Sequence, residues 1–254
     1  GIHYAVAFAK TVNARLLLAY FEPVPYLDPD TFIAEPMVES LEEGRRQLAE
    51  LAGQLSADVP CDHLAQAGAA PDMIVATARE RHADWILMTT KGAGNKPEVL
   101  VGSVAAEVAA HTPCPMLIVP QGFRFKPIDK IVLAADLEAT DRRLLTPLIS
   151  LAKTTNAQVT ALHVKTEDTG LDEKKAVESV RLEEWLSDVP ATAHVLKHPD
   201  VQEGIDQFAN RQDAGLVAVI ARKHGFFASL FHRSVVRLVT IYTTVPLMVI
   251  PEQA

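Results

Sequence analysis

Two kinds of hydrophobic pattern alternate along the first half of this chain. Short apolar runs of strand length lie between longer segments whose apolar residues recur at helical spacing. The predicted helices span residues 2–12, 38–56 and 71–82, with a further one that begins at Gly102-Ser103. The predicted strands span residues 15–21, 62–66, 84–88 and 116–119, and residues 22–39 read as an irregular proline-rich excursion. Strands that alternate with helices predict right-handed crossovers and a parallel sheet covered on both faces.

The same pattern restarts after a linker at residues 121–126. The predicted strands of the second half span residues 130–135, 158–164, 192–197, 216–220 and 247–250. The predicted helices span residues 140–155, 172–187, 201–211 and 234–242. We therefore expect an α/β protein with two tandem doubly wound (Rossmann-like) domains at 1–122 and 127–254, each with a five-stranded parallel sheet.

An internal repeat supports this division. Residues 9–14 (AKTVNA) match residues 152–157 (AKTTNA) at an offset of 143, and His111–Pro115 match Tyr242–Pro246 at an offset of 131. Such self-similarity indicates a tandem duplication. In this alignment the strand at 130–136 has no counterpart, so the first domain lacks its opening strand in the sequence as printed. We expect the missing strand to precede residue 1, because its absence would leave a hydrophobic slot and unpaired backbone.

Composition narrows the class of protein. A hydrophobic content of 48% and a mean hydropathy of +0.11 indicate a packed protein, and no apolar run reaches the length of a membrane span. The net charge of −8 argues against a broad nucleic-acid-binding face. Two cysteines, Cys61 and Cys114, are too few for a disulfide framework and fit a reducing compartment. We therefore expect neither a nucleic-acid nor a membrane partner.

The stretch Met88–Pro120 carries the chemistry. It reads as the end of a buried strand, a glycine-bearing loop, a helix that opens at Gly102-Ser103, and a second buried strand. Glycine lets the backbone approach a ligand closely, and serine is a favoured N-cap residue. The free amides and positive dipole end of a helix start attract anions. This stretch therefore predicts a phosphate-binding site.

The same stretch resembles the nucleotide loop of the universal stress protein family. The family pattern is Gly, two residues, Gly, nine residues, Gly and then Ser or Thr. In this sequence Thr89 stands at the first glycine, Gly92 fits the second, and Gly102-Ser103 close the pattern after residues 93–101. Asp136 fits the acid that the family has at the end of its first strand. Thr89 is a departure, because its β-branched side chain would hinder close approach of a ribose.

The resemblance implies a cytoplasmic stress-response protein that holds ATP or another adenine nucleotide in its first domain. Adenine would pack near the end of the second strand and the residue before the loop, and the glycines and helix start would hold ribose and phosphates. The nucleotide contacts so implied are Phe21, Met88, Thr89, Gly92, Gly102, Ser103 and Val104. The family also commonly pairs through its last strands, which implies that 116–119 and 247–250 pair within the chain, with a homodimer left open.

The second half departs further from the family pattern. Arg222 replaces the first glycine, Gly225 is kept, and Arg233 replaces the glycine before Ser234. The loop between them is shorter and contains Phe226 and Phe227, which would occupy the volume of a nucleotide. We therefore expect that this half has lost the nucleotide site.

Three functions remain open. In the first, nucleotide orders residues 91–101 and so changes the surface offered to a protein partner. In the second, the chain is a nucleotide-free scaffold for a protein partner. The third, a slow ATP hydrolase, is weakened because no nucleophile–base pair stands out and Ser103 lacks the strand-turn setting of a hydrolase serine. Catalysis and a metal site are therefore not indicated.

Overall fold

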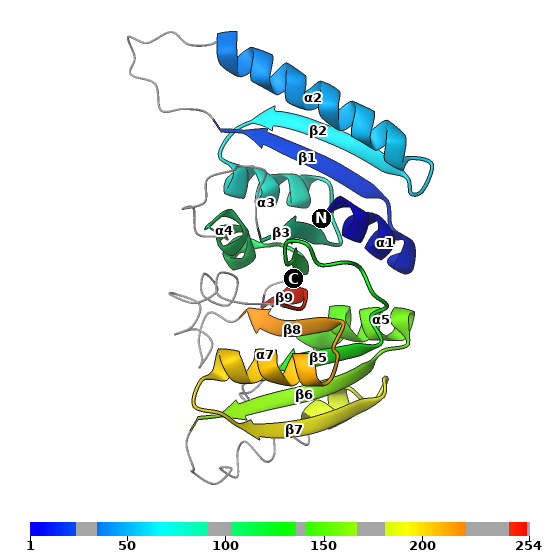
Figure 1. Cartoon of the computed structure of the whole chain (residues 1–254), viewed down its shortest axis with the longest axis vertical. Coiled ribbons are helices and arrows are strands. Elements are labelled where there is room, and N and C mark those ends of the chain that lie inside the picture. The colour runs from blue at the N-terminus through cyan, green and yellow to red at the C-terminus, as the bar shows by residue number, and fades with distance from the viewer. Residues whose placement is uncertain (24–34, 91–102, 136–140, 167–180, 222–243, 253–254) are drawn as a thin grey trace. The chain divides into compact units, whose positions relative to one another are not determined.

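The computed structural model describes residues 1–23, 35–90, 103–135, 141–166, 181–221 and 244–252 of the 254-residue chain. Contacts divide the chain into two compact units. One unit is Ile2–His82, and the other is Ala83–Ala254 together with Gly1 (Figure 1).

The unit Ile2–His82 is a two-stranded parallel sheet with helices packed on it. Its elements are α1 (Ile2–Val12), β1 (Leu16–Glu22), α2 (Glu35–Leu55), β2 (Cys61–Ala67) and α3 (Ala70–Glu80). The register runs from Leu16 opposite Cys61 to Glu22 opposite Ala67. Helix α2 lies along both strands (Figure 1). Tyr4 and Phe8 of α1 are buried. The order helix–strand–helix–strand–helix agrees with the sequence pattern to within about three residues at each boundary.

The unit that begins at Ala83 is built on one seven-stranded sheet. Its strands are β3 (Ile86–Thr89), β4 (Met116–Val119), β5 (Lys130–Ala134), β6 (Gln158–Lys165), β7 (Ala191–Lys197), β8 (Leu216–Ala221) and β9 (Leu247–Pro251). They lie in the order β3-β4-β9-β8-β5-β6-β7, and every neighbouring pair is parallel except β4 with β9. Its helices are α4 (Ser103–His111), the 3₁₀ turn η1 (Arg142–Leu145), α5 (Thr146–Thr155) and α7 (Val201–Arg211).

The order β9-β8-β5-β6-β7 is that of a doubly wound sheet, in which the first strand of the repeat lies in the middle. Each parallel connection needs a crossover, and α5 and α7 supply two of these. Residues 181–185 are also helical and belong to the helix expected at 172–187. The rest of that helix, and the helix expected at 234–242, lie outside the described residues.

The antiparallel pair β4–β9 joins strands of the two repeats and forms the centre of the core. Leu117 lies opposite Met248, and Ile118 lies opposite Leu247. Every residue of both strands is buried. The expectation that these two strands pair within the chain is confirmed. The pairing of β4 with β9 also explains why the two compact units do not coincide with the two repeats. Strands β3 and β4 belong to the first repeat in the sequence, but they lie in the same sheet as the strands of the second repeat.

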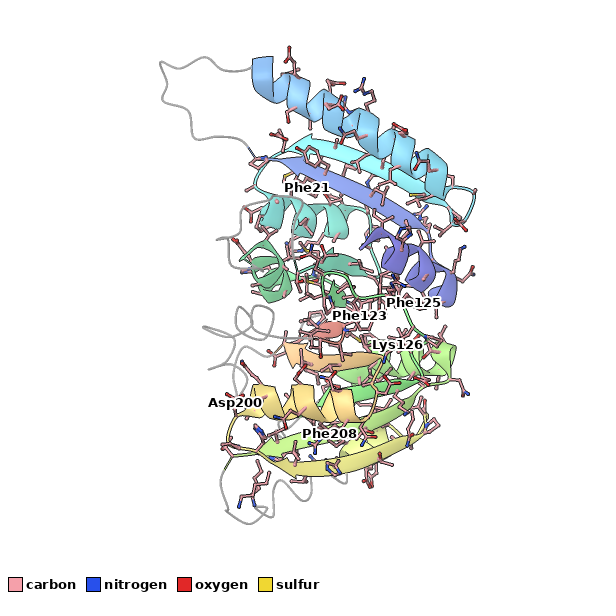
Figure 2. The ribbon with its side chains drawn as sticks, in the orientation of Figure 1. Phe21, Phe123, Phe125, Lys126, Asp200 and Phe208 are labelled. Carbon is pink, nitrogen blue, oxygen red and sulfur yellow. The ribbon has the colours of Figure 1, made fainter. Side chains whose placement is uncertain are left out.

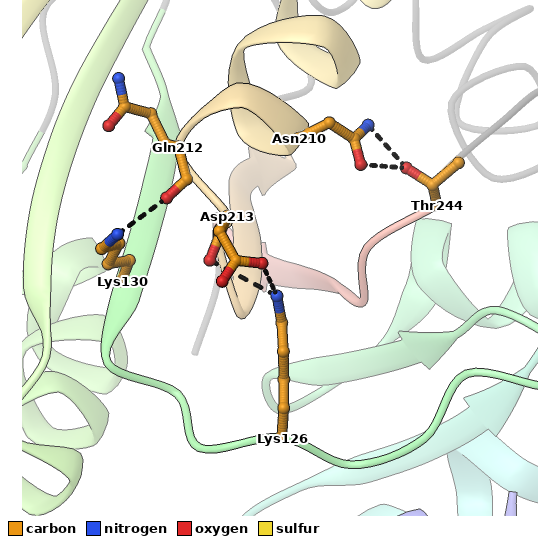
Figure 3. A network of polar contacts seen from close by, with 6 residues as sticks. All are labelled: Lys126, Lys130, Asn210, Gln212, Asp213 and Thr244. Carbon is orange, nitrogen blue, oxygen red and sulfur yellow. Dashed lines mark hydrogen bonds and ion pairs between the residues drawn. The ribbon is translucent and has the colours of Figure 1, made fainter.

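Helix α7 matches its predicted span because both of its ends are capped. The Asp200 carboxylate accepts a hydrogen bond from the Glu203 amide at 2.9 Å, which satisfies a free donor of the first turn. At the other end the Lys130 ammonium donates to the Gln212 carbonyl at 3.0 Å, and Lys126 pairs with Asp213 (Figure 3). Cations at this end also favour the helix dipole.

The duplication extends to local geometry. Asn13 and Asn156 end the matched helices with left-handed backbone angles, φ 53° and φ 54°. The following amides, of Ala14 and Ala157, donate to the carbonyls of Ala9 and Ala152 at 2.9 and 2.8 Å. A matched ion pair occurs in each repeat as well, between Lys10 and Asp58 and between Lys153 and Asp188. Two copies of one folding unit therefore account for the chain.

Candidate functional site

The carboxyl edge of β3 and β4 is where the predicted phosphate site falls. The two strands are parallel and in register, with Met88 opposite Ile118 and Thr89 opposite Val119, so both end at one edge of the sheet. Helix α4 connects them and must run opposite to both strands, because it returns the chain to the start of β4. Its first residue, Ser103, therefore lies at the same edge. This is the position at which doubly wound sheets bind ligands.

The predicted nucleotide contacts fall into three groups. Met88, Thr89 and Val104 are half-buried residues of β3 and of the first turn of α4, and the helix starts at Ser103. Phe21 is the sixth residue of β1, 8% exposed, and belongs to the unit Ile2–His82 (Figure 2). Gly92 and Gly102 lie outside the described residues. The structure thus brings four of the seven residues into one strand–helix unit.

Small buried residues hold α4 in place. Ala105, Ala106, Val108 and Ala109 are at most 3% exposed, and the helix packs against β9. After the helix, the buried Thr112 hydroxyl donates to the Cys114 carbonyl at 2.6 Å and fixes the turn into β4. Burial raises the pKa of the Cys114 thiol to about 11, so this thiol stays neutral. The buried Cys114 side chain therefore contributes to packing at the start of β4.

Thr90 fixes the edge of the sheet, and the sequence analysis did not single it out. Its amide donates to the Val119 carbonyl at 3.1 Å, and its hydroxyl accepts from the Gln121 amide at 3.1 Å. These two bonds join the ends of β3 and β4 just before the predicted loop. The sequence does show a threonine directly after a buried strand. Its partner, the Gln121 amide, could be identified only from the pairing of β3 with β4.

Thr89, the departure from the family pattern, has a defined neighbour. A Cβ atom placed on Gly1 would lie 2.7 Å from the Thr89 Cγ2 methyl. The methyl group of Thr89 therefore lies against Gly1. A side chain at position 1 would not fit beside Thr89 in this arrangement.

A second polar cluster lies at the end of β1, in the unit Ile2–His82. The Tyr20 hydroxyl and the Ser40 hydroxyl both donate to the Glu22 carboxylate, the latter at 3.0 Å. The hydrogen bond to Glu22 raises the pKa of Tyr20. The cluster ties the start of α2 to the end of β1. Ser40 is 18 residues from Glu22, so spacing in the sequence could not reveal the contact.

The counterpart of this site in the second half remains a prediction. Strand β8 ends at Ala221, and Arg222, Gly225, Phe226, Phe227, Arg233 and Ser234 lie outside the described residues, as does Asp136. Within the described parts of the chain, no three His, Cys, Asp or Glu side chains are grouped so that they could hold a metal ion. Over the same residues no helix is both long and apolar enough to cross a bilayer.

The order β9-β8-β5-β6-β7, with helices as crossovers between parallel strands, places this chain in the class of doubly wound α/β proteins. The sequence model of the universal stress protein family matches this chain twice, over residues 1–120 and 127–251. The chain therefore belongs to the universal stress protein family, and it is a tandem member. The resemblance found in the sequence is confirmed.

Individual relatives agree with this assignment. A universal stress protein encoded in the QAH/OAS sulfhydrylase 3' region of Thermus aquaticus is 34% identical over 116 residues, which are 45% of this chain and 84% of that protein. A crystal structure of a universal stress protein from Archaeoglobus fulgidus matches with a TM-score of 0.73 at 19% identity, over 98% of this chain and 90% of that chain. That match shows the fold along nearly the whole chain.

A further Archaeoglobus fulgidus universal stress protein was solved in complex with dAMP. It is 20% identical and covers 49% of this chain and 99% of its own, with a TM-score of 0.38. The dAMP complex is a property of that protein.

Proposed function

We propose that this chain is a cytoplasmic stress-response protein that binds an adenine nucleotide, such as ATP, in its first domain (1–122) and not in its second (127–254). The observation that carries the proposal is the meeting of Met88, Thr89 and the start of α4 at one sheet edge. These elements flank a loop with the family spacing that ends in Gly102-Ser103. The amides of the helix start would hold phosphates, and Met88 would contact adenine.

Phe21, Gly92 and Val104 complete the proposed site on the family resemblance. The dAMP complex of the Archaeoglobus fulgidus protein shows that a family member can hold an adenine nucleotide.

Nucleotide binding would act by population shift. A nucleotide that contacts Gly92, Gly102 and Ser103 would favour one arrangement of residues 91–101 and so change the surface offered to a protein partner. The shift can be no larger than the difference in nucleotide affinity between the two arrangements.

Two measurements test the proposal. Mass spectrometry of ligand released from the purified full chain should detect an adenine nucleotide, and calorimetric titration with ATP and AMP should show saturable binding. Absence of both would contradict the proposal and favour the nucleotide-free scaffold. Phosphate release from ATP that is abolished by Gly102→Val would instead support the slow hydrolase at this site.

A further inference from the structure

A polar cavity of about 260 Å³, open to solvent and lined mostly by exposed polar residues, lies at the amino ends of β5, β6 and β7, beside the last turns of α7. It is at the opposite end of the strands from the carboxyl edge at which doubly wound sheets bind nucleotides. The polar side chains around it are those of Lys130, Gln158, Thr160, Thr192, His194 and Gln212. All of its lining residues belong to the unit that begins at Ala83.

Two threonines of neighbouring strands line the cavity. Val132, Thr160 and Thr192 lie side by side across β5, β6 and β7, and the hydroxyl oxygens of Thr160 and Thr192 are 3.5 Å apart. Alternation along β6 places Thr160 on the same face as Val164, which lies next to Gly204 of α7. A sheet face under a helix is ordinarily apolar. At the equivalent of Thr160 the first repeat has Leu17, so the hydroxyls are a feature of the second repeat alone.

The other polar groups around the cavity are available to a ligand. Among the residues that the structure describes, the side-chain amides of Gln158 and Gln212 and the ring nitrogens of His194 have no hydrogen-bond partner. The His194 ring packs on Phe208 of α7, with centroids 4.8 Å apart, and Phe208 is 6% exposed (Figure 2). Hydroxyls and amides both donate and accept hydrogen bonds, so the rim suits a ligand that does the same.

The charges around the cavity favour a neutral ligand. Among the described residues that line it there is no carboxylate, so none of them offers a cation a counter-charge. Lys130 is the one formally charged residue in that set, and its ammonium already donates to the Gln212 carbonyl at the negative end of α7 (Figure 3). The partial negative charge at the end of α7 offsets the positive charge of the Lys130 ammonium, which leaves little net attraction for an anion.

We propose that this cavity binds a neutral polyhydroxylated molecule of the size of a monosaccharide. Its volume lies just below the range typical of pockets for drug-sized ligands, which suits a ligand as small as a monosaccharide. The Thr160 and Thr192 hydroxyls and the two glutamine amides hydrogen-bond the ligand hydroxyls, and Val132 and Phe208 contact its carbon skeleton. For a ligand of about a dozen heavy atoms with ordinary efficiency, the expected Kd is about millimolar.

The test is a titration of the full chain with D-glucose and with myo-inositol, followed by ligand-observed NMR up to about twenty times the expected Kd. We expect saturable binding of at least one of them. Thr160→Val and Thr192→Val keep the side-chain shape but remove a hydroxyl, so each should weaken binding about five- to tenfold. The matched control is Thr154→Val on α5, whose hydroxyl bonds the Ser150 carbonyl. This control should bind like the unaltered chain.

Three results would overturn the inference. They are no saturation with either polyol, unchanged binding in both cavity variants, and tighter binding of inorganic phosphate than of the neutral ligands. Circular dichroism of each variant establishes whether it is folded. If Thr160→Val does not fold, Thr192→Val still tests the inference, because Thr192 is the more exposed of the two residues. ATP binding should be unaffected by either variant, so the nucleotide proposal stands or fails separately.

Discussion

Leu117 of β4 lies directly opposite Met248 of β9, and both side chains are completely buried. This contact joins the last strand of one repeat to the last strand of the other by antiparallel pairing within a sheet that is otherwise parallel. The edge of β4 that faces away from β3 is therefore covered by β9 of the second repeat.

Truncation at this contact should be costly. Leu117→Ala removes buried methyl groups and leaves a cavity between β4 and β9, so we expect a loss of about 2–5 kcal/mol in the free energy of unfolding, measured by urea titration. The matched control is Val195→Ala on β7, where the side chain is 42% exposed. Val195→Ala should lower the free energy of unfolding by well under half of the loss seen for Leu117→Ala. Equal losses at the two positions would contradict the placement of Leu117 in the core.

Two glycines of α2 should respond in opposite ways to alanine. A Cβ at Gly44 would lie 2.6 Å from Tyr20 Cε1 and 2.7 Å from Cδ1, whereas a Cβ at Gly53 meets nothing within 4 Å. Gly53→Ala should raise the free energy of unfolding by about 0.5–1 kcal/mol through helix propensity. Gly44→Ala should lower it by about 1–3 kcal/mol, because the packed Tyr20 ring must move. Stabilisation by both substitutions would show that α2 does not pack on Tyr20 as described.

The left-handed ends of α1 and α5 predict a residue preference at two equivalent positions. Asn156→Gly should leave the free energy of unfolding nearly unchanged, because glycine tolerates φ 54°. Asn156→Val should cost about 1–2 kcal/mol, because a β-branched residue is strained there. At Asn13 the glycine variant should likewise have a higher free energy of unfolding than the valine variant. Valine tolerated as well as glycine at either site would be inconsistent with the helix ends seen here.

Cys114 predicts a change of stability in alkaline solution. Burial raises its pKa to about 11 in the folded chain, while an unfolded thiol ionises near pH 8.5–9. Because the folded chain holds the thiol proton more tightly than the unfolded chain, Cys114 contributes to the free energy of unfolding. This contribution is complete below about pH 9 and is lost as the pH rises toward 11. The size of the loss is about 2–3 kcal/mol. Cys114→Val, which copies Val245 of the second repeat, should lack this part of the decline in urea titrations between pH 8 and 11. Parallel pH curves for the variant and the unaltered chain would contradict it.

Much of the fold could be predicted because local and tertiary signals agree. Strand β4 and helix α7 have the predicted bounds, the first because it is apolar throughout and follows proline, the second because Asp200 caps it. The helix expected at 140–155 is different at its start. The chain from Arg142 to Leu145 is a 3₁₀ turn with Asp141 as its cap, and α5 begins only at Thr146, with Pro147 in its first turn. Periodicity does not distinguish these two kinds of helix.

The candidate site was harder to predict completely. Met88, Thr89 and Ser103 could be assigned to one sheet edge from the order of strand, helix and strand. The Thr90–Gln121 bond and the Tyr20–Glu22–Ser40 cluster depend on strand register and helix packing, which a single sequence does not display. The polar cavity near Thr160 depends on three strands at once. Each of its residues is individually unremarkable in the sequence.

The most direct measurement is calorimetric titration of the full chain with ATP, because nucleotide stoichiometry separates the two repeats. We expect one nucleotide per chain, loss of binding in Gly102→Val, and tighter binding in Thr89→Gly if the methyl group obstructs the ribose. Arg233→Gly in the second repeat should leave the stoichiometry at one. Two nucleotides per chain, or full affinity in Gly102→Val, would contradict a single nucleotide site at the start of α4.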